Sequence, residues 1–435
     1  MGEEREREYL GLLCTFFFIA LWTVLPLYMR EGYWQLGDAK YILFRNVTIS
    51  CLSIWLIVEV GDLLSRKKRN RTWSILDSAM IVYFITQLLT FLASPYRALA
   101  WAGYEQWYMG FFSQLLFVGI YFFVSRCYDQ KLGKVAFWIG QGSFLILVSI
   151  GILNRMRIDP LGVFAAWGNQ DWESTHLLTT IGNVNWLAGF LVVTVPISVV
   201  GYLSFPATST PRKAIVLLYL NSVMGALLLC IQPSDTGVLA LGVAVVLLVL
   251  LLYQKKTPFD RLLSLGIGLM IGLWILGIWY EIRDPQQLYV WEGLGCALLE
   301  WRGWPLPAGL LLLSKMLPFR NDGWTSRRRL LLLLVLAFAG LACGMVLLPH
   351  VVALFGGGYA WGNGRGGLWT LAMKSFVSFD WLHKIVGIGQ DCYGEFTTAT
   401  FHTADYLQMK GPFSNSFFTN AHNEWLTQLV NTGIL

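Results

Sequence analysis

Long apolar runs separated by short polar gaps make up most of the chain. A helix needs about 20 apolar residues to cross the hydrocarbon core of a bilayer. The pattern predicts twelve membrane-spanning segments, at 10–29, 41–60, 73–93, 107–125, 135–153, 183–204, 214–231, 238–253, 262–280, 292–312, 330–350 and 421–435. The tenth is the weakest, because Glu300 and Arg302 lie inside it; either the two charges pair or the span is shorter and partly interfacial.

The composition agrees with a membrane protein. Hydrophobic types make up 56% of the 435 residues and charged types 13%, against about 25% charged residues in an ordinary soluble domain. A compact soluble fold has too little interior for that much apolar surface. We therefore exclude soluble, disordered and fibrous classes and predict an all-α fold, a polytopic membrane protein with about 12 transmembrane helices and a large external loop before the last helix.

Basic residues gather in the gaps between apolar runs. With the N-terminus in the cytoplasm, the predicted spans put every basic cluster on the cytoplasmic side, as the positive-inside rule requires. The clusters are 66–71, 126–134, 212–213, 255–261 and 327–329. Although the net charge is +6, this distribution argues against a nucleic-acid partner. The 7 cysteines form no C-x-x-C pair, so neither a disulfide framework nor a zinc site is expected.

The topology divides the chain into three parts. Residues 1–350 form a bundle of eleven spans, residues 351–420 form a large external loop, and residues 421–435 begin the last span. The loop is rich in Gly, Trp and Phe, which suits a structured cap on the membrane surface. The last segment is barely long enough to span, and one interpretation is that the chain is truncated at Leu435.

Two polar patterns stand at helix starts on the predicted external face. Residues 182–189 place Asn183 and Asn185 at the mouth of the sixth span, where they could bind a polar headgroup. Residues 232–237 place Asp235 in the tight turn before the eighth span, where an acid at membrane depth is unusual. For each pattern the alternative is a simple helix cap.

Two more patterns lie near the end of the chain. Arg365 is flanked by glycines, and its planar, permanently charged guanidinium suits a diphosphate; the alternative is a solvated surface arginine. His422 precedes Asn423 at the start of the last segment. An imidazole titrates near neutrality and could take a proton from a sugar hydroxyl. The other four histidines, at 176, 350, 383 and 402, are expected to be structural.

Together the four patterns resemble the O-antigen ligase and polymerase superfamily. The His-Asn-x-x-Leu element followed by Thr-Gly-Ile/Leu is similar to 422–426 and 432–435, and the Gly-Asn-x-Asn-x-x-Ala element to 182–188. The Gly-Arg…Trp element with a Gly-x-Gly turn looks like 364–369 and 387–389. The likeness covers roughly 94–435, with the motifs in the family's order on the predicted external face.

The chain departs from the family pattern at one phosphate site. Many relatives carry a Ser-Arg-Gly-type turn where this chain has Ser234-Asp235-Thr236-Gly237, so the second phosphate-binding arginine is missing there. Four arginines from neighbouring external loops are candidates to replace it: Arg97, Arg155, Arg157 and Arg283.

The resemblance implies a glycosyltransferase of the bacterial cytoplasmic (inner) membrane that needs no metal or cofactor and inverts the sugar configuration. Its donor is a glycan on a polyprenyl diphosphate such as undecaprenyl diphosphate, and its acceptor is a hydroxyl on a glycan, lipid or protein. Arg365 would hold the diphosphate, His422 would orient or deprotonate the acceptor, and Asn423 would fix the imidazole. The alternatives are a protein O-oligosaccharyltransferase of the same superfamily and a transporter without covalent chemistry, which would need charges at mid-membrane.

Overall fold

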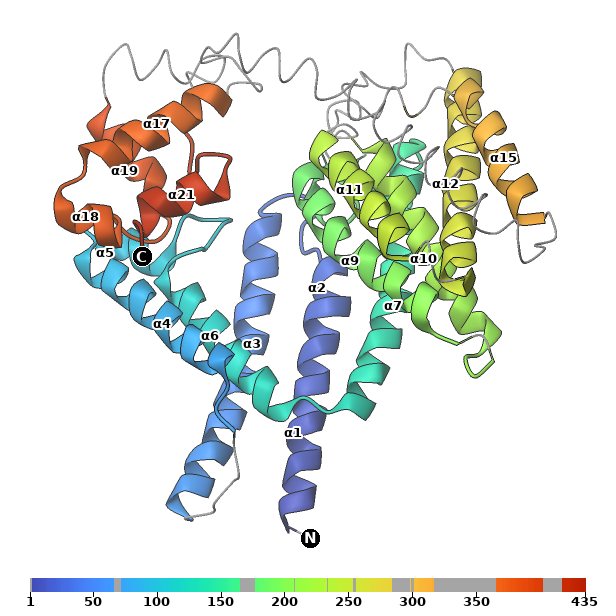
Figure 1. The fold of residues 1–435 in the computed structure, drawn as a ribbon. Helices are drawn as coiled ribbons and strands as arrows, with labels where there is room; N and C mark the ends of the chain where they lie inside the picture. The colour runs from blue at the N-terminus through green and yellow to red at the C-terminus, as the bar shows by residue number, and fades with distance from the viewer. Residues whose placement is uncertain are drawn as a thin grey trace. The chain divides into compact units, whose positions relative to one another are not determined.

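A computed structural model gives the fold of most of the chain (Figure 1). It describes residues 2–65, 72–164, 177–206, 208–232, 234–252, 256–283, 298, 301–316, 365–401 and 417–435. The helices are α1 (Gly2–Ile19), α2 (Leu25–Leu27), α3 (Leu36–Leu64), α4 (Ile75–Ala93), α5 (Arg97–Ala102), α6 (Phe111–Cys127), α7 (Gln130–Arg155), α9 (Val184–Ser204), α10 (Arg212–Ile231), α11 (Asp235–Leu252), α12 (Lys256–Ile282), α15 (Pro305–Met316), α17 (Arg365–Ser378), α18 (Trp381–Val386), α19 (Tyr393–Thr400) and α21 (Glu424–Asn431). A π-helical turn η1 (Ala20–Val24), a 3₁₀ turn η3 (Trp301–Gly303) and one antiparallel pair of two-residue strands, β1 (Leu177–Leu178) and β2 (Gly182–Asn183), complete the described elements.

The prediction of a mostly helical chain is confirmed, and the length and apolar composition of its helices suggest a multi-pass membrane protein. Seven helices are long and apolar enough to cross a membrane, and two shorter apolar helices, Phe111–Cys127 and Gly237–Leu252, coincide with the fourth and eighth predicted spans. The seven are Arg5–Leu27, Leu36–Leu64, Ile75–Ala93, Gln130–Arg155, Val184–Ser204, Arg212–Ile231 and Thr257–Ile282. The total of about 12 spans is not confirmed: the eleventh, at 330–350, lies outside the described residues, and the tenth and the last differ from the structure as described next.

Two predicted spans differ from the structure. In the tenth, the described residues form the η3 turn and then α15, a helix of 12 residues, and Arg302 pairs with Glu281, its Nη2 lying 2.7 Å from Oε1. In the last, α21 covers 8 residues and the chain then turns at Gly433, whose φ is +73°. A helix that short cannot cross the hydrocarbon core, and 421–435 is instead part of a packed group of short helices.

The chain divides into two compact units. Unit 1 holds α1, α3, α4, α5 and α6 together with the four short helices α17, α18, α19 and α21, which we call the C-terminal module. Unit 2 holds η1, α2, α7, the strand pair, α9 to α12, η3 and α15. The two units are described separately below.

Unit 2 is built on α7, α9, α10 and α12, whose leucines fill its core. Its interior also contains a small polar cluster in which the side-chain oxygen of Gln141 accepts hydrogen bonds from Ser198 Oγ and Asn221 Nδ2, each at 2.8 Å. These three residues come from α7, α9 and α10 and are at most 1% exposed. Polar groups away from water must find partners inside the protein, so the cluster holds the three helices in register.

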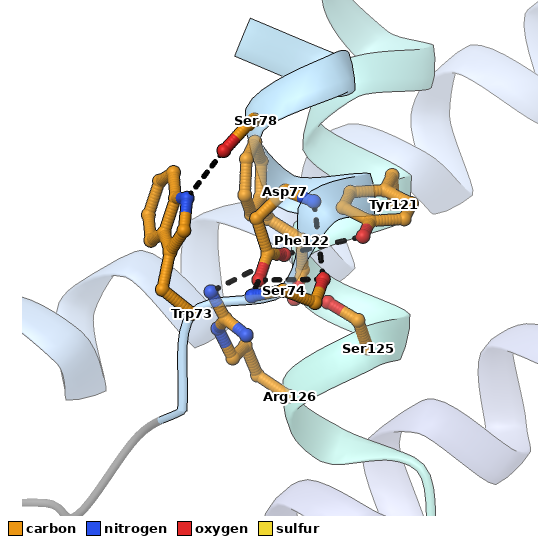
Figure 2. Close-up of polar contacts among 8 residues, drawn as sticks. All are labelled: Trp73, Ser74, Asp77, Ser78, Tyr121, Phe122, Ser125 and Arg126. Carbon is orange, nitrogen blue, oxygen red and sulfur yellow. Dashed lines mark hydrogen bonds and ion pairs between the residues drawn. The ribbon is translucent and has the colours of Figure 1, made fainter.

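In unit 1, the start of α4 is fixed to the end of α6 (Figure 2). Ser74 and Asp77 form a reciprocal capping box, in which Asp77 N donates to Ser74 Oγ at 3.1 Å and Ser74 N donates to Asp77 Oδ2 at 2.8 Å. The other carboxylate oxygen, Oδ1, lies 3.5 Å from Arg126 Nη2 and accepts a 3.2 Å bond from Tyr121 OH. The carboxylate of Asp77 therefore has partners at the start of α4 and on α6. In the sequence, α4 begins shortly after the basic segment 66–71.

The opposite end of α4 carries the C-terminal module, through a segment that we call the buried turn (Gly387–Cys392). All six of its residues are buried, although none is in a helix or strand. Ile388 N donates to Val430 O at 3.2 Å and Gly389 N to Asn431 O at 3.0 Å, while Ile388 O accepts a 2.6 Å bond from Ser94 Oγ. Irregular backbone can be buried only when its polar groups are paired in this way.

Gly387 is the position in the buried turn that tolerates a side chain least. Its φ is +70°, and a Cβ there would lie 2.2 Å from Asn431 O. We predict that Gly387→Ala lowers the free energy of unfolding by about 2–4 kcal/mol, the sum of left-handed strain and overpacking.

The measurement is unfolding in mixed detergent micelles, with Gly61→Ala as the matched control. Gly61 lies in α3 of the same unit, and nothing is within 4 Å of a Cβ built there, so the control should be neutral or slightly stabilising. Equal stability of the two variants would contradict the described turn.

Candidate functional site

The structure brings together two of the motifs singled out in the sequence, the Gly387–Gly389 turn and the Thr432–Leu435 segment. Besides the two bonds from the buried turn to Val430 and Asn431, the backbone of Ile434 donates to Lys384 O at 3.1 Å and that of Leu435 to Ile385 O at 3.2 Å. The chain after α21 therefore runs along α18 and the buried turn. Local sequence explains this path, because glycines at 387 and 433 both adopt positive φ.

Arg365 and His422 also lie close together in the C-terminal module. Arg365 is the first residue of α17, and His422 stands two residues before α21; the two helices pack against each other. Both side chains are exposed at the surface. The pKa of His422 is nevertheless lowered from its ordinary value, first by the partial burial of the imidazole among neighbouring groups and then by the charge of the Arg365 guanidinium. The lowered pKa favours the neutral imidazole, which is the form that can accept a proton.

The backbone around His422 is held in an uncommon conformation. His422 has a φ of +50°, its N–H donates to Asn420 Oδ1 at 2.9 Å, and its ring packs edge-on against Phe418 at 5.8 Å between centroids. A residue without a glycine's freedom adopts positive φ only where its surroundings require it. The position of the imidazole is thus set by the fold.

Asn423 acts as a helix cap. Its side-chain oxygen accepts the N–H of Leu426 at 3.2 Å at the start of α21, and its backbone oxygen accepts a 2.9 Å bond from Thr427 Oγ1. Since the side chain is engaged with the helix, no contact to the imidazole is seen in the described residues. Its expected role in fixing the ring stays a prediction.

Asp391 is a residue that the sequence analysis missed. It lies at the end of the buried turn, is 9% exposed, and accepts the N–H of Tyr104 on Oδ2 at 2.8 Å; the N–H of Met109 also donates to it. Burial raises the pKa of Asp391, and the Glu424 carboxylate raises it further, against the two N–H donors. An aspartate directly after Gly-x-Gly was the available sequence signal, but its partners are almost 300 residues away.

Asp391 fixes a loop between α5 and α6, residues 103–110, against the C-terminal module. The ring of Tyr104 in this loop meets Phe417 at 5.4 Å, next to the Phe418 that contacts His422. The far side of the loop is held by Asp38, whose Oδ1 accepts the N–H of Gln106 at 2.9 Å. The loop and the imidazole are therefore joined through two adjacent aromatic residues.

The remaining predicted site residues are divided between the units. Arg97 is exposed at the start of α5 in unit 1, with Nη2 donating to Leu92 O at 3.3 Å. In unit 2, Asn183 caps α9 by accepting the N–H of Asn185 at 2.8 Å, and Asn185 is exposed. The helix-cap alternative for this motif is thus the arrangement observed. Asp235 begins α11, and its side chain lies outside the described residues.

Two of the three candidate arginines in unit 2 do not stand on an open loop as expected, whereas the third, Arg283, follows α12 with its guanidinium 4.9 Å from the ring centroid of Trp279. Arg155 is the last residue of α7 and is 1% exposed, and its backbone oxygen accepts a 2.8 Å bond from Tyr280 OH. Arg157 is partly buried with a φ of +59°. Helix α7 simply continues further than the predicted span, which carries Arg155 into the core of unit 2.

Gln232 is a second missed residue. It follows α10, is fully buried, and neither its side-chain oxygen nor its nitrogen has a partner among the described residues. A Cβ built at Gly237 would lie 3.4 Å from Gln232 Nε2 and 3.5 Å from the Cβ of Ala188. The motifs at 182–189 and 232–237 therefore lie side by side in unit 2.

Comparison of the chain with protein-family models, with curated proteins and with solved structures finds no match. Among the described residues, no group of three or more His, Cys, Asp or Glu side chains is arranged to hold a metal ion.

The proximity of Arg365 and His422 gives a direct prediction. Arg365→Gln removes a positive charge that disfavours the imidazolium, so the pKa of His422 should rise toward its ordinary value of 6.5. The measurement is a pH titration of selectively labelled histidine by NMR, with Lys374→Gln on the same helix as the control. An unchanged His422 titration in Arg365→Gln would show that the two side chains are not near each other.

The sign of the accompanying stability change follows from linkage. The folded pKa of His422 lies below that of the unfolded chain, so the unfolded chain binds the proton more readily. The contribution of His422 to the free energy of unfolding is fully present above pH 6.5. It is lost as the pH falls through the lower pKa that His422 has in the folded chain. Arg365→Gln should make that loss smaller.

Proposed function

We propose that the chain is a membrane glycosyltransferase, a ligase or polymerase that moves a glycan from a polyprenyl diphosphate to an acceptor hydroxyl. The observation that carries the proposal is the proximity of Arg365 and His422, two residues far apart in sequence, which helices α17 and α21 bring within electrostatic reach of each other in one module. A fixed cation beside a neutral base suits the displacement of a phosphate leaving group by a hydroxyl.

In the proposed glycosyl transfer, His422 and Arg365 have separate roles. The acceptor oxygen attacks the anomeric carbon of the first sugar, the bond from that carbon to the phosphate oxygen breaks, and the polyprenyl diphosphate leaves with the electron pair. The proton of the acceptor hydroxyl passes to the neutral imidazole of His422. The guanidinium of Arg365 stabilises the charge that develops on the departing diphosphate. Attack opposite the leaving group inverts the anomeric centre.

The position of the module supports an external active site. Helix α4 has 19 residues and is therefore about 28 Å long, close to the thickness of a bilayer core. Its first turn adjoins the basic segment 66–71, which the positive-inside rule assigns to the cytoplasm. The Ser94 end, with the buried turn and His422, would then face the outside of the bacterial cytoplasmic membrane.

The buried acid Asp391 supports the proposal in a different way. By holding loop 103–110 against the module it fixes the aromatic residues behind His422. A general base must keep its geometry through the reaction, and an exposed histidine at a chain turn would otherwise be mobile.

The test is release of undecaprenyl diphosphate from an undecaprenyl-diphosphate-linked glycan by the purified full chain, with membranes of the source cell as acceptor. His422→Ala and Arg365→Ala should each lower the rate by about 10²-fold or more. His383→Ala is the matched control, because His383 lies in the same module but is engaged with Asp380, its Nδ1 lying 2.9 Å from Oδ1; its activity should stay near that of the unchanged chain.

Two outcomes would assign a different function. Glycan found only on Ser or Thr of proteins would identify a protein O-oligosaccharyltransferase. Movement of the lipid-linked glycan across proteoliposomes without a new glycosidic bond would identify a transporter. Turnover in both alanine variants equal to that of the unchanged chain would contradict the proposed mechanism.

A further inference from the structure

Helix α18 presents a row of apolar side chains to the outside of unit 1. Trp381 is 75% exposed, Leu382 40% and Ile385 36%. Ile434, whose N–H donates to the backbone of Lys384 in this helix, is 67% exposed. Four large apolar side chains are thus exposed on one short helix and on the chain segment beside it, and such a surface is unfavourable in water.

The helix that carries this apolar surface packs against a membrane helix. Helix α18 packs against α4, a candidate membrane span whose exposed side chains near the contact end include Leu89 and Leu92, at 44% and 51%. In a spanning helix such side chains face lipid. Helix α18 thus carries its exposed apolar side chains at the end of a helix that itself exposes apolar side chains.

The chain after α18 enters the protein beside the same helix. Within the buried turn, Gln390 is 3% exposed, and its Nε2 donates to the backbone and side-chain oxygens of Gln87 at 2.6 and 3.0 Å. Gln87 lies six residues before the end of α4, which is about 9 Å along the helix axis. The side chain of Gln390 thus contacts α4 about 9 Å inside the end of that helix. Backbone groups of the buried turn are hydrogen-bonded within the protein.

A basic side chain, Arg97, stands at the same end of α4, and a second, Lys374, is exposed elsewhere in the C-terminal module. Arg97 is exposed, and its guanidinium lies beside Leu92 O; Lys374 is exposed on α17. The neighbouring acid, Asp380, caps α18 and contacts the imidazole of His383 through both carboxylate oxygens. Tryptophan together with arginine and lysine is the typical composition of a protein surface at lipid headgroups.

We propose that residues Trp381–Cys392 are an interfacial re-entrant segment. Helix α18 lies in the headgroup region of the bilayer, with Trp381, Leu382 and Ile385 facing the acyl-chain boundary, and the buried turn then descends inside the protein to the depth of Gln87. The partner of this surface is the bilayer itself, and Arg97 and Lys374 contact its anionic headgroups. This inference does not depend on the proposed glycosyltransferase activity.

The test is photolabelling of the full chain in nanodiscs that contain phosphatidylglycerol and a phospholipid with a diazirine close to the glycerol. Trypsin cleavage after Lys374 and Lys384 gives a peptide, 375–384, that contains Trp381 and Leu382. The peptide 72–97 contains α4 and is the positive control in the same sample. We expect label on Trp381 or Leu382. Label on 72–97 without label on 375–384 would overturn the proposal.

A double variant, Trp381→Glu with Leu382→Glu, tests the contact independently. Both side chains are exposed, so the change opens no core, and unfolding in detergent micelles should be unaltered. Label on 375–384 should fall about tenfold, because carboxylates are disfavoured at the acyl-chain boundary, while label on 72–97 stays the same. The matched control is Trp73→Glu, an exposed tryptophan at the other end of α4, which should leave label on 375–384 unchanged. Equal labelling of the double variant and the unchanged chain would contradict the proposal.

Discussion

Unit 1 depends on one constraint, the need to pair every backbone group of a buried segment that is neither helix nor strand. The buried turn meets a large part of this need by bonding to three parts of the chain: His383 in α18, Ser94 after α4, and the 430–431 end of α21. In an apolar environment each unpaired group would cost several kcal/mol. The segments that supply the partners are therefore fixed relative to one another, and the C-terminal module is fixed to α4.

The candidate site follows from that anchorage. Helix α21 is tied to the buried turn through its last residues, and α17 packs on α21, so Arg365 and His422 are brought together by a framework in which neither takes part. Asp391 adds the loop 103–110 to the same framework. Removing either side chain should for this reason leave the fold intact, so that an effect on activity can be separated from an effect on stability.

Sequence reasoning was most successful where the physical signal is local. Apolar runs bounded by polar gaps predicted 73–93 and 183–204, and the helices are Ile75–Ala93 and Val184–Ser204. For 421–435 the prediction of a span is wrong. Hydropathy alone predicts it, whereas Thr427, Val430 and Asn431 face the interior of the module. The segment then turns at Gly433. The burial of Arg155 and the contacts of Asp391 arise from long-range packing, for which a single sequence has no periodic signal. The motif glycines at 387 and 389 were recognisable, but not the backbone partners that require them.

We propose that Arg365 holds the diphosphate close to the imidazole of His422. This claim is tested most directly by titrating labelled His422 by NMR in the presence and absence of saturating undecaprenyl diphosphate. A bound dianion favours the imidazolium, so the claim predicts that the pKa of His422 rises on binding, and that the rise is lost in Arg365→Gln, which binds the diphosphate poorly. An identical His422 titration with and without the lipid would contradict the claim.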